Sequence, residues 1–173
     1  MTGSLDWTAA VERADLLAAP VADAIAGVPD ARAAEIDPEL ADTAAFCERY
    51  EVPLEASANC VVVAAKRGGE VSYLACMILA TDRVDVNGVV RKHLGARKAS
   101  FAPMAEAISL TGMEYGGITP VGLPAGWPIL VDEAVAAAPE VVIGSGLRRS
   151  KLLVPGKALA ALPGAEVLAL AQT

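Results

Sequence analysis

Residues 112–146 read GMEYGGITPVGLPAGWPILVDEAVAAAPEVVIGSG and hold two glycine-dense turns on either side of a short apolar strand. Glycine allows backbone conformations and close approaches that a Cβ atom would block. Turns of this kind can direct unshielded backbone N–H groups at a ligand. The stretch therefore predicts recognition of a small molecule or an acyl group by the backbone, and it is not typical of a metal site or a nucleophile motif.

The rest of the chain mixes helical and extended patterns without a regular β-α-β repeat. Apolar spacing predicts helices over residues 6–18, 38–50, 85–94, 103–111 and 157–162. Asp37 and Pro38 are typical of a helix start. Apolar and β-branched runs predict strands over residues 60–65, 71–80, 99–102, 129–131, 141–143, 152–154 and 166–170. This mixture favours an α+β fold with a mixed, barrel-like β-sheet flanked by helices.

Length and charge narrow the class of protein. The 173 residues suit one domain with a possible appendage. No apolar run is long enough to span a membrane, and no basic-then-apolar leader begins the chain, so we expect a soluble, cytoplasmic protein. Residues 1–55 hold 12 of the 21 acidic residues but only 3 of the 14 basic ones. The mildly basic remainder indicates either an anionic partner or simply an acidic, solvated N-terminal face.

Cysteine and histidine are too sparse and too scattered to predict a metal site. The chain has three cysteines, Cys47, Cys60 and Cys76, and one histidine, His93. Zinc sites usually show closely spaced Cys and His pairs, and none is present. We therefore expect no metal and no disulfide, with the cysteines reduced in or near the core.

Several segments, in this order, resemble the YbaK/ProX family, which includes prolyl-tRNA-synthetase-associated editing domains and free-standing aminoacyl-tRNA deacylases. The matching segments are residues 60–80, 82–85, 94–98, 102–112, 116–123, 131–133 and 144–146. The resemblance implies an editing domain over residues 37–173, preceded by an N-terminal helical extension over residues 1–36. It also implies hydrolysis of the ester of mischarged tRNA without metal or cofactor. The implied partners are the tRNA acceptor end and an aminoacyl-tRNA synthetase.

The catalytic candidates are Asn59, Gly116 and Gly117. An aminoacyl ester is already activated, so its hydrolysis needs a placed water and donors for the developing oxyanion. Gly116 and Gly117 are predicted to supply backbone N–H donors, although the same pair could be a tight turn that requires positive φ. Family members typically carry a lysine at the start of the first strand, where this chain has Asn59. Arg148 or Arg149 could restore the missing charge if the fold brings either one close.

A second glycine turn is predicted to form the opposite wall of the pocket through Gly144, Ser145 and Gly146. Ser145 could bond the substrate amine or the terminal ribose, or it could bond its own turn. Asp132 could hold the substrate α-ammonium, or it could cap the helix that follows. The predicted substrate pocket is completed by Cys60, Thr119 and Pro120.

Basic residues predict contact with tRNA phosphates if they share one face. The candidates are Lys66, Arg67, Arg97, Lys98, Arg148, Arg149 and Lys151. Aromatic residues make up only 4 % of the chain, so base stacking on an aromatic platform is not expected.

Three functions remain open from sequence. The first is an aminoacyl-tRNA deacylase that acts in trans. The second is a non-catalytic relative, in which Asn59 marks lost hydrolysis but a retained binding pocket. The third is a hydrolase of small esters or thioesters on the same scaffold.

Overall fold

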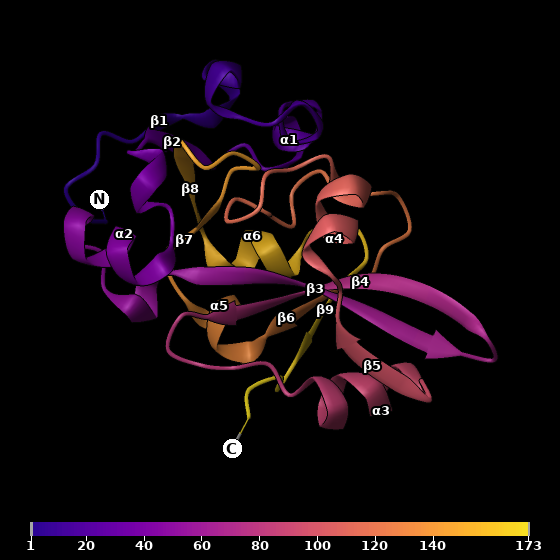
Figure 1. The fold of residues 1–173 in the computed structure, drawn as a ribbon. Coiled ribbons are helices and arrows are strands. Elements are labelled where there is room, and N and C mark those ends of the chain that lie inside the picture. Colours follow the sequence, from indigo (N-terminus) through magenta and orange to yellow (C-terminus); the bar gives the residue numbers. More distant parts are fainter. Residues whose placement is uncertain (1, 173) are drawn as a thin grey trace.

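The computed structural model describes residues 2–172 and shows an α+β fold built on two β-sheets, which confirms the predicted class (Figure 1). The first sheet has the order β1-β2-β8-β7 and all its pairs are antiparallel. Its strands are β1 (Thr8–Ala9), β2 (Arg32–Glu35), β8 (Ser150–Val154) and β7 (Val141–Gly144). The two sheets do not close into a single barrel.

The second sheet has the order β5-β3-β4-β6-β9 and contains the predicted hairpin. Its strands are β3 (Ala58–Arg67), β4 (Glu70–Leu79), β5 (Lys98–Phe101), β6 (Ile129–Asp132) and β9 (Ala165–Leu168). β3 and β4 pair antiparallel along their whole length, from Ala58 opposite Leu79 to Arg67 opposite Glu70. β6 and β9 add parallel strands, so the sheet is mixed as expected.

Six short α-helices in the described part of the chain, residues 2–172, flank the sheets. They are α1 (Ala19–Ala24), α2 (Thr43–Tyr50), α3 (Arg91–Leu94), α4 (Met104–Thr111), α5 (Glu133–Ala137) and α6 (Gly156–Ala160). α3 and α4 end at Gly95 and Gly112, both in the left-handed conformation that favours glycine, as the sequence predicted. Among residues 2–172, no helix has the length and apolar character needed to cross a membrane.

The predicted helix over residues 6–18 is wrong. The segment instead forms β1 and two 3₁₀ turns, Ala10–Glu12 and Ala14–Leu16, before α1 begins. Its apolar residues have helical spacing, but its backbone forms hydrogen bonds with residues distant in sequence. β1 pairs with β2, and the Ala10 N–H donates to the carbonyl of Ala31 at 2.9 Å. Tertiary pairing therefore overrides local periodicity here.

The predicted helix over residues 38–50 is interrupted near its start. A 3₁₀ turn over Pro38–Leu40 comes first, and α2 begins only at Thr43. The Asp37 side chain accepts a hydrogen bond from the Glu39 N–H at 3.0 Å, which confirms its predicted role as a cap. The break leaves residues 41 and 42 between the two helical segments.

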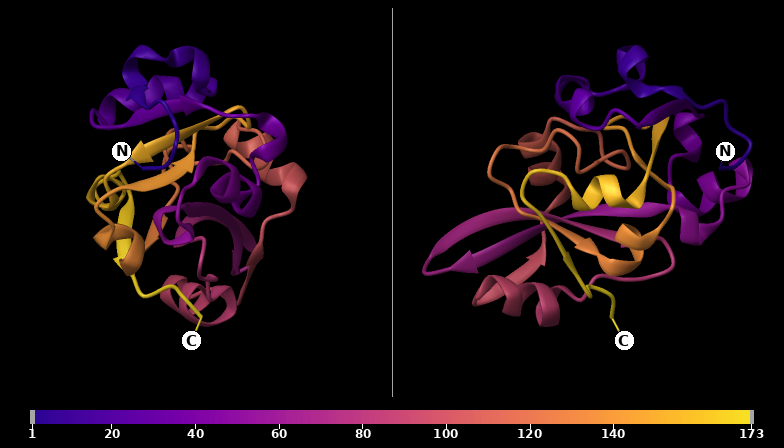
Figure 2. Two further views of the ribbon diagram at one scale, coloured as in Figure 1. Left: turned by 90° about the vertical axis from the view of Figure 1, so that its left-hand side faces the viewer. Right: turned by 180° about the vertical axis from the view of Figure 1, so that it is seen from behind.

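The N-terminal segment lies across the first sheet, on the side away from α3 and the C-terminus (Figures 1 and 2). Its buried residues Leu16 and Val21 share one apolar cluster with Met77 of β4, Ile143 of β7 and Leu152 of β8. Residues before position 37 are thus packed into the same core as the strands that follow.

The two glycine turns contact each other backbone to backbone. The Gly146 N–H donates to the Gly117 carbonyl at 2.7 Å, and the Glu114 N–H donates to the Gly146 carbonyl at 2.9 Å. A Cβ atom at Gly117 would lie 2.6 Å from the carbonyl oxygen of Leu147, and one at Gly144 would lie 2.7 Å from that of Ile118. Close approach of the chains is therefore what requires glycine at these two positions.

We expect Gly144→Ala to lower the free energy of unfolding by about 1–3 kcal/mol, because its methyl group meets carbonyl oxygens that cannot move independently. Urea denaturation measures this effect. Gly27→Ala is the matched control, since Gly27 has open space around its Cβ position. Equal stability of the two variants would contradict the packing described for the turns.

Candidate functional site

A cleft of about 250 Å³ opens beside the two turns. Four segments enclose it: the residues before and at the start of α2, the start of β3, the turn after residue 114, and the facing ends of β7 and β8. The lining residues that bear on its chemistry are Thr43, Asn59, Cys60, Gly116, Ile118, Gly144 and Lys151. The fold thus brings both glycine turns and the start of the first long strand to one hollow.

Asn59 is held at the mouth of this cleft by α2. The Thr43 hydroxyl donates to the Asn59 side-chain oxygen at 2.8 Å. This bond fixes the amide and leaves its NH₂ group as the donor that can face a ligand. Asn59 stands where the sequence resemblance places a lysine, and it therefore offers an oriented neutral donor there.

Two backbone N–H groups of the first turn are available to a ligand. Gly116 and Ile118 both line the cleft, and within residues 2–172 neither N–H has a protein acceptor. Gly116 has φ +87°, a backbone conformation that favours glycine. Gly117 differs from its predicted role, because it is buried and its N–H donates to the Glu114 carbonyl at 3.0 Å. Gly117 therefore supports the turn, and Gly116 and Ile118 are the residues of this turn that could offer N–H donors in the cleft.

Arg148 braces the rim of the cleft. Its guanidinium donates to the Tyr115 carbonyl at 3.1 Å and to the Pro38 carbonyl at 3.2 Å. Its own N–H donates to the Glu114 carboxylate at 2.8 Å. Arg149 points elsewhere, toward the carbonyl of Asp15. The two neighbouring arginines therefore do not share one face, and only Arg148 lies near the cleft.

Lys151 lies inside the cleft, and sequence reasoning missed this. Lys151 is only 8 % exposed. Its Nζ donates to the Ala41 carbonyl at 3.1 Å and lies 5.2 Å from the centre of the Phe46 ring. Burial lowers the pKa of the Lys151 ammonium to about 8. Lys151 stands opposite Gly144 in the β7–β8 register. The signal in the sequence was the apolar run that follows it, which marks Lys151 as part of a buried strand.

Ser145 and Asp132 are used within the fold. The Ser145 hydroxyl is fully buried, lies 2.6 Å from the Ser150 hydroxyl and accepts from the Leu147 N–H at 3.2 Å. One Asp132 oxygen caps α5 by accepting from the Ala134 N–H at 3.2 Å, and the other accepts from the Leu170 N–H at 2.8 Å. Neither residue lines the cleft. The structure therefore favours the interpretation that Ser145 bonds within its own turn and that Asp132 caps the helix that follows it.

The other predicted pocket residues divide between the cleft and its surroundings. Cys60 lines the cleft, and burial raises the pKa of its thiol, which keeps it neutral. Gly146 contacts Ala18. Thr119 is fully buried, and its hydroxyl has no hydrogen-bond partner among residues 2–172. Within residues 2–172, no three His, Cys, Asp or Glu side chains gather in a way that could hold a metal ion.

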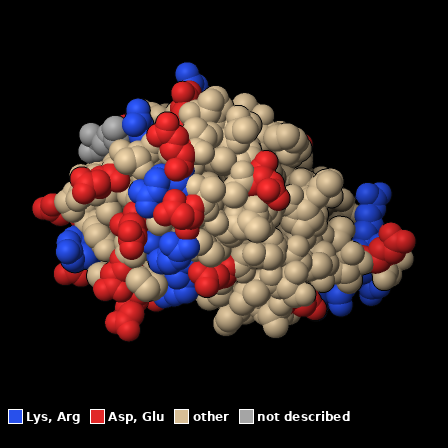
Figure 3. All heavy atoms as spheres, turned by 90° about the horizontal axis from the view of Figure 1, so that it is seen from above, with Lys and Arg blue, Asp and Glu red and all other residues tan. Residues whose placement is uncertain are grey.

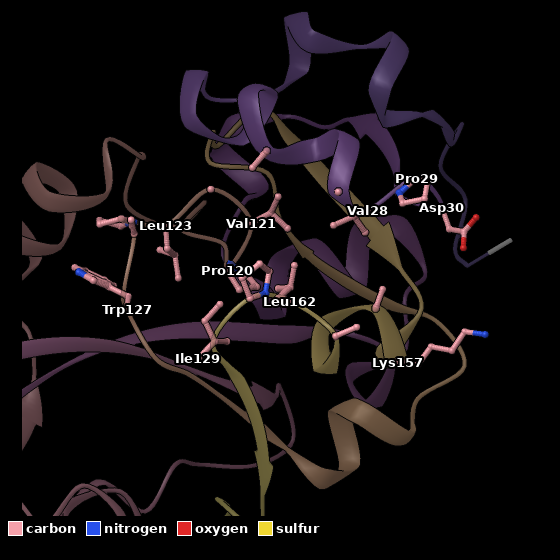
Figure 4. A pocket seen from close by; sticks show the side chains of 18 of the residues that line it. Val28, Pro29, Asp30, Pro120, Val121, Leu123, Trp127, Ile129, Lys157 and Leu162 are labelled. Carbon is pink, nitrogen blue, oxygen red and sulfur yellow. The ribbon is translucent and has the colours of Figure 1, made fainter.

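Pro120 lines a different and larger cavity, of about 580 Å³ (Figure 4). This cavity lies between residues 24–30, the loop after Pro120 and α6, and its walls are largely apolar. Its charged lining residues are Asp30 and Lys157, whose charged ends point away from the middle of the cavity in Figure 4. It lacks the converging polar groups that ester chemistry needs, so we assign the candidate site to the smaller cleft.

A basic cluster occupies the turn of the β3–β4 hairpin. Lys66, Arg67, Arg97 and Lys98 line one surface hollow there, and Lys66 pairs with Lys98 across β3 and β5. Figure 3 shows Lys and Arg side chains at this end of the molecule, beyond a broad face with few charges. Four of the seven residues predicted to bind tRNA are thus gathered together.

Comparison with known proteins identifies the family. Residues 37–162 match the aminoacyl-tRNA editing domain family, and the chain belongs to that family. The fold is similar to that of a protein described as a candidate trans-editing enzyme for prolyl-tRNA synthetase, with 23 % identity and a TM-score of 0.78 over 90 % of this chain and 97 % of that one. A hypothetical protein is similar at 23 % identity and a TM-score of 0.77, over 88 % of this chain and 99 % of that one. The resemblance found in the sequence is thereby confirmed.

Ser145→Ala should lower the free energy of unfolding by about 1–3 kcal/mol, because it leaves buried partners of the hydroxyl unsatisfied. Chemical denaturation of this variant is compared with that of Ser72→Ala, in which the serine is exposed on β4. A Ser145→Ala protein as stable as its control would show that the buried serine pair does not support the second turn.

Proposed function

We propose that this chain hydrolyses the ester bond of mischarged aminoacyl-tRNA in trans, with the terminal aminoacyl-adenosine bound in the cleft beside Gly116. The observation that carries the proposal is the pair of free N–H groups at Gly116 and Ile118, which line the same hollow as Asn59. Membership of the editing-domain family and the trans-editing description of one structural relative support it.

The reaction needs a placed water and groups that stabilise the oxyanion. A water molecule adds to the ester carbonyl carbon, and the carbonyl oxygen becomes an oxyanion. The bond from that carbon to the ribose oxygen then breaks, and the ribose oxygen takes one proton of the water. The second proton passes to the solvent, and the amino acid leaves as its carboxylate. Each well-placed donor to the oxyanion contributes about 3–4 kcal/mol to the barrier reduction.

The cleft residues divide these tasks. The N–H groups of Gly116 and Ile118 face the developing oxyanion, and the oriented amide of Asn59 binds the ribose or the attacking water. Thr43 holds that amide in place through its 2.8 Å bond. Cys60 remains a neutral wall residue, because burial raises the pKa of its thiol.

The basic cluster at the hairpin turn extends the binding surface toward the body of the tRNA. Lys66 follows Asn59 by seven residues on β3, which corresponds to about 23 Å along an extended strand. An acceptor end bound in the cleft therefore has phosphates within reach of Lys66, Arg67, Arg97 and Lys98.

Release of free amino acid from a panel of mischarged tRNAs tests the proposal directly. We expect hydrolysis of at least one aminoacyl-tRNA well above the spontaneous rate. Binding without release would favour the non-catalytic reading. Cleavage of small esters with indifference to tRNA would favour a metabolite hydrolase, and either result would overturn the proposal.

Gly116→Val should reduce the deacylation rate by about 100-fold or more, because its Cβ atom would collide with the Arg148 guanidinium and shift the turn that carries the donor. The matched control is Gly126→Val. Gly126 has φ +85°, close to the +87° of Gly116, but it has open space around it and lies outside the cleft. Equal losses in the two variants would show that backbone strain, and not the site, accounts for the effect.

Lys66→Ala and Arg97→Ala should each weaken binding of tRNA and reduce the slope of log affinity against log salt concentration by about 0.7–0.9. Fluorescence anisotropy over a series of salt concentrations measures this slope. Lys157→Ala, on the rim of the larger cavity, serves as the control. An unchanged slope in both test variants would place the tRNA on another face.

A further inference from the structure

We propose that Lys151 is the cationic group of the cleft, and that its ammonium binds the ester carbonyl oxygen and stabilises the oxyanion formed there. This inference rests on the proposed function and adds a catalytic residue to it. Lys151 on β8 would thereby supply the positive charge that Asn59 on β3 does not provide.

The topology puts Lys151 and Asn59 on facing walls of one hollow. A parallel bridge between Ser57 and Val142 joins the chain just before β3 to β7. β7 in turn pairs with β8, with Gly144 opposite Lys151. Both Asn59 and Lys151 line the cleft. A cation can therefore reach the same substrate from the opposite strand.

The ammonium has capacity to bind a ligand. An ammonium carries three donors, and the hydrogen bond to the Ala41 carbonyl at 3.1 Å uses one of them. Among residues 2–172, no carboxylate lies within ion-pair distance of Lys151. A buried charge without an anionic partner is unfavourable for folding, and it is tolerated where a ligand supplies the counter-charge. A developing oxyanion is such a partner.

Other charged and titratable groups around Lys151 do not neutralise it. Cys47 of α2 is close enough to influence the Lys151 ammonium, and burial raises the pKa of that thiol, which keeps it uncharged. Asp42 and Arg148 act on Lys151 in opposite directions from the rim, and Asp42 is largely exposed. Cys60 and Tyr115 complete the titratable groups that line the cleft. The main influence on the ammonium is its own burial.

The pH dependence follows from that burial. The pKa of Lys151 is lowered to about 8, so the charged form prevails below pH 8 and is lost above it. The rate enhancement over spontaneous hydrolysis should therefore decline as pH rises through 8. The free energy of unfolding has the opposite pH dependence. In the unfolded chain Lys151 has the ordinary pKa of lysine, so between about pH 8 and that value the unfolded chain binds the proton and the folded protein does not. The folded protein therefore becomes more stable as pH rises through this range.

The test compares Lys151→Met, Lys151→Arg and the control Lys157→Met on the tRNA that the wild-type protein hydrolyses fastest. We expect Lys151→Met to lose about 100-fold in rate while its Tm at pH 7 rises, because an unpaired buried charge is removed. Lys151→Arg should keep activity and lose the decline above pH 8, since its charge persists. Asn59→Lys in the Lys151→Met background should restore part of the rate.

The outcomes separate the two proposals. Wild-type hydrolysis with an unchanged rate and pH profile in Lys151→Met would overturn the role of Lys151 and leave the proposed function standing. A wild-type protein that hydrolyses no aminoacyl-tRNA would overturn both. If Lys151→Met does not fold, the pH profile of the wild-type protein tests the role of Lys151 instead. A rate enhancement over spontaneous hydrolysis that stays constant from pH 7 to 10 would contradict that role.

Discussion

The cleft depends on one backbone contact, the hydrogen bond from the Gly146 N–H to the Gly117 carbonyl. This contact holds the turn at residues 114–118 against the end of β7, at a distance that side chains at Gly117 and Gly144 would not permit. The Gly117 N–H donates to the Glu114 carbonyl, whereas the N–H groups of Gly116 and Ile118, which line the hollow, have no acceptor among residues 2–172. Within this turn, Gly117 therefore serves packing, and its neighbours Gly116 and Ile118 are the candidates for ligand recognition.

The N-terminal segment supports this contact from behind. The Ser150 hydroxyl donates to the Leu16 carbonyl, the Ala18 N–H donates to the Ser145 carbonyl at 3.3 Å, and Gly146 packs on Ala18. These residues precede the part of the chain that matches the editing-domain family, which begins at residue 37. Position 151 is therefore fixed by its strand partners and by a segment outside the family match, which helps to keep a buried lysine in place.

Local signals in the sequence predict much of the fold. The β3–β4 hairpin, the cap at Asp37 and the glycines that end α3 and α4 are all set by neighbouring residues, and all are confirmed. The helix over residues 6–18 is wrong because a strand distant in sequence takes its hydrogen bonds. The apolar run after Lys151 indicates a buried strand, but the place of its ammonium in the cleft depends on α2 and Phe46, which are distant in sequence. Local pattern thus predicts elements, and it does not predict which side chains converge.

The most direct test of the cleft is a crystal structure with a non-hydrolysable aminoacyl-adenosine, in which an amide replaces the ester. The acyl oxygen should lie within hydrogen-bond distance of the Gly116 and Ile118 N–H groups, with the Lys151 ammonium beside it. Binding of the ligand in the larger apolar cavity near Trp127, with the cleft empty, would contradict this assignment of the site.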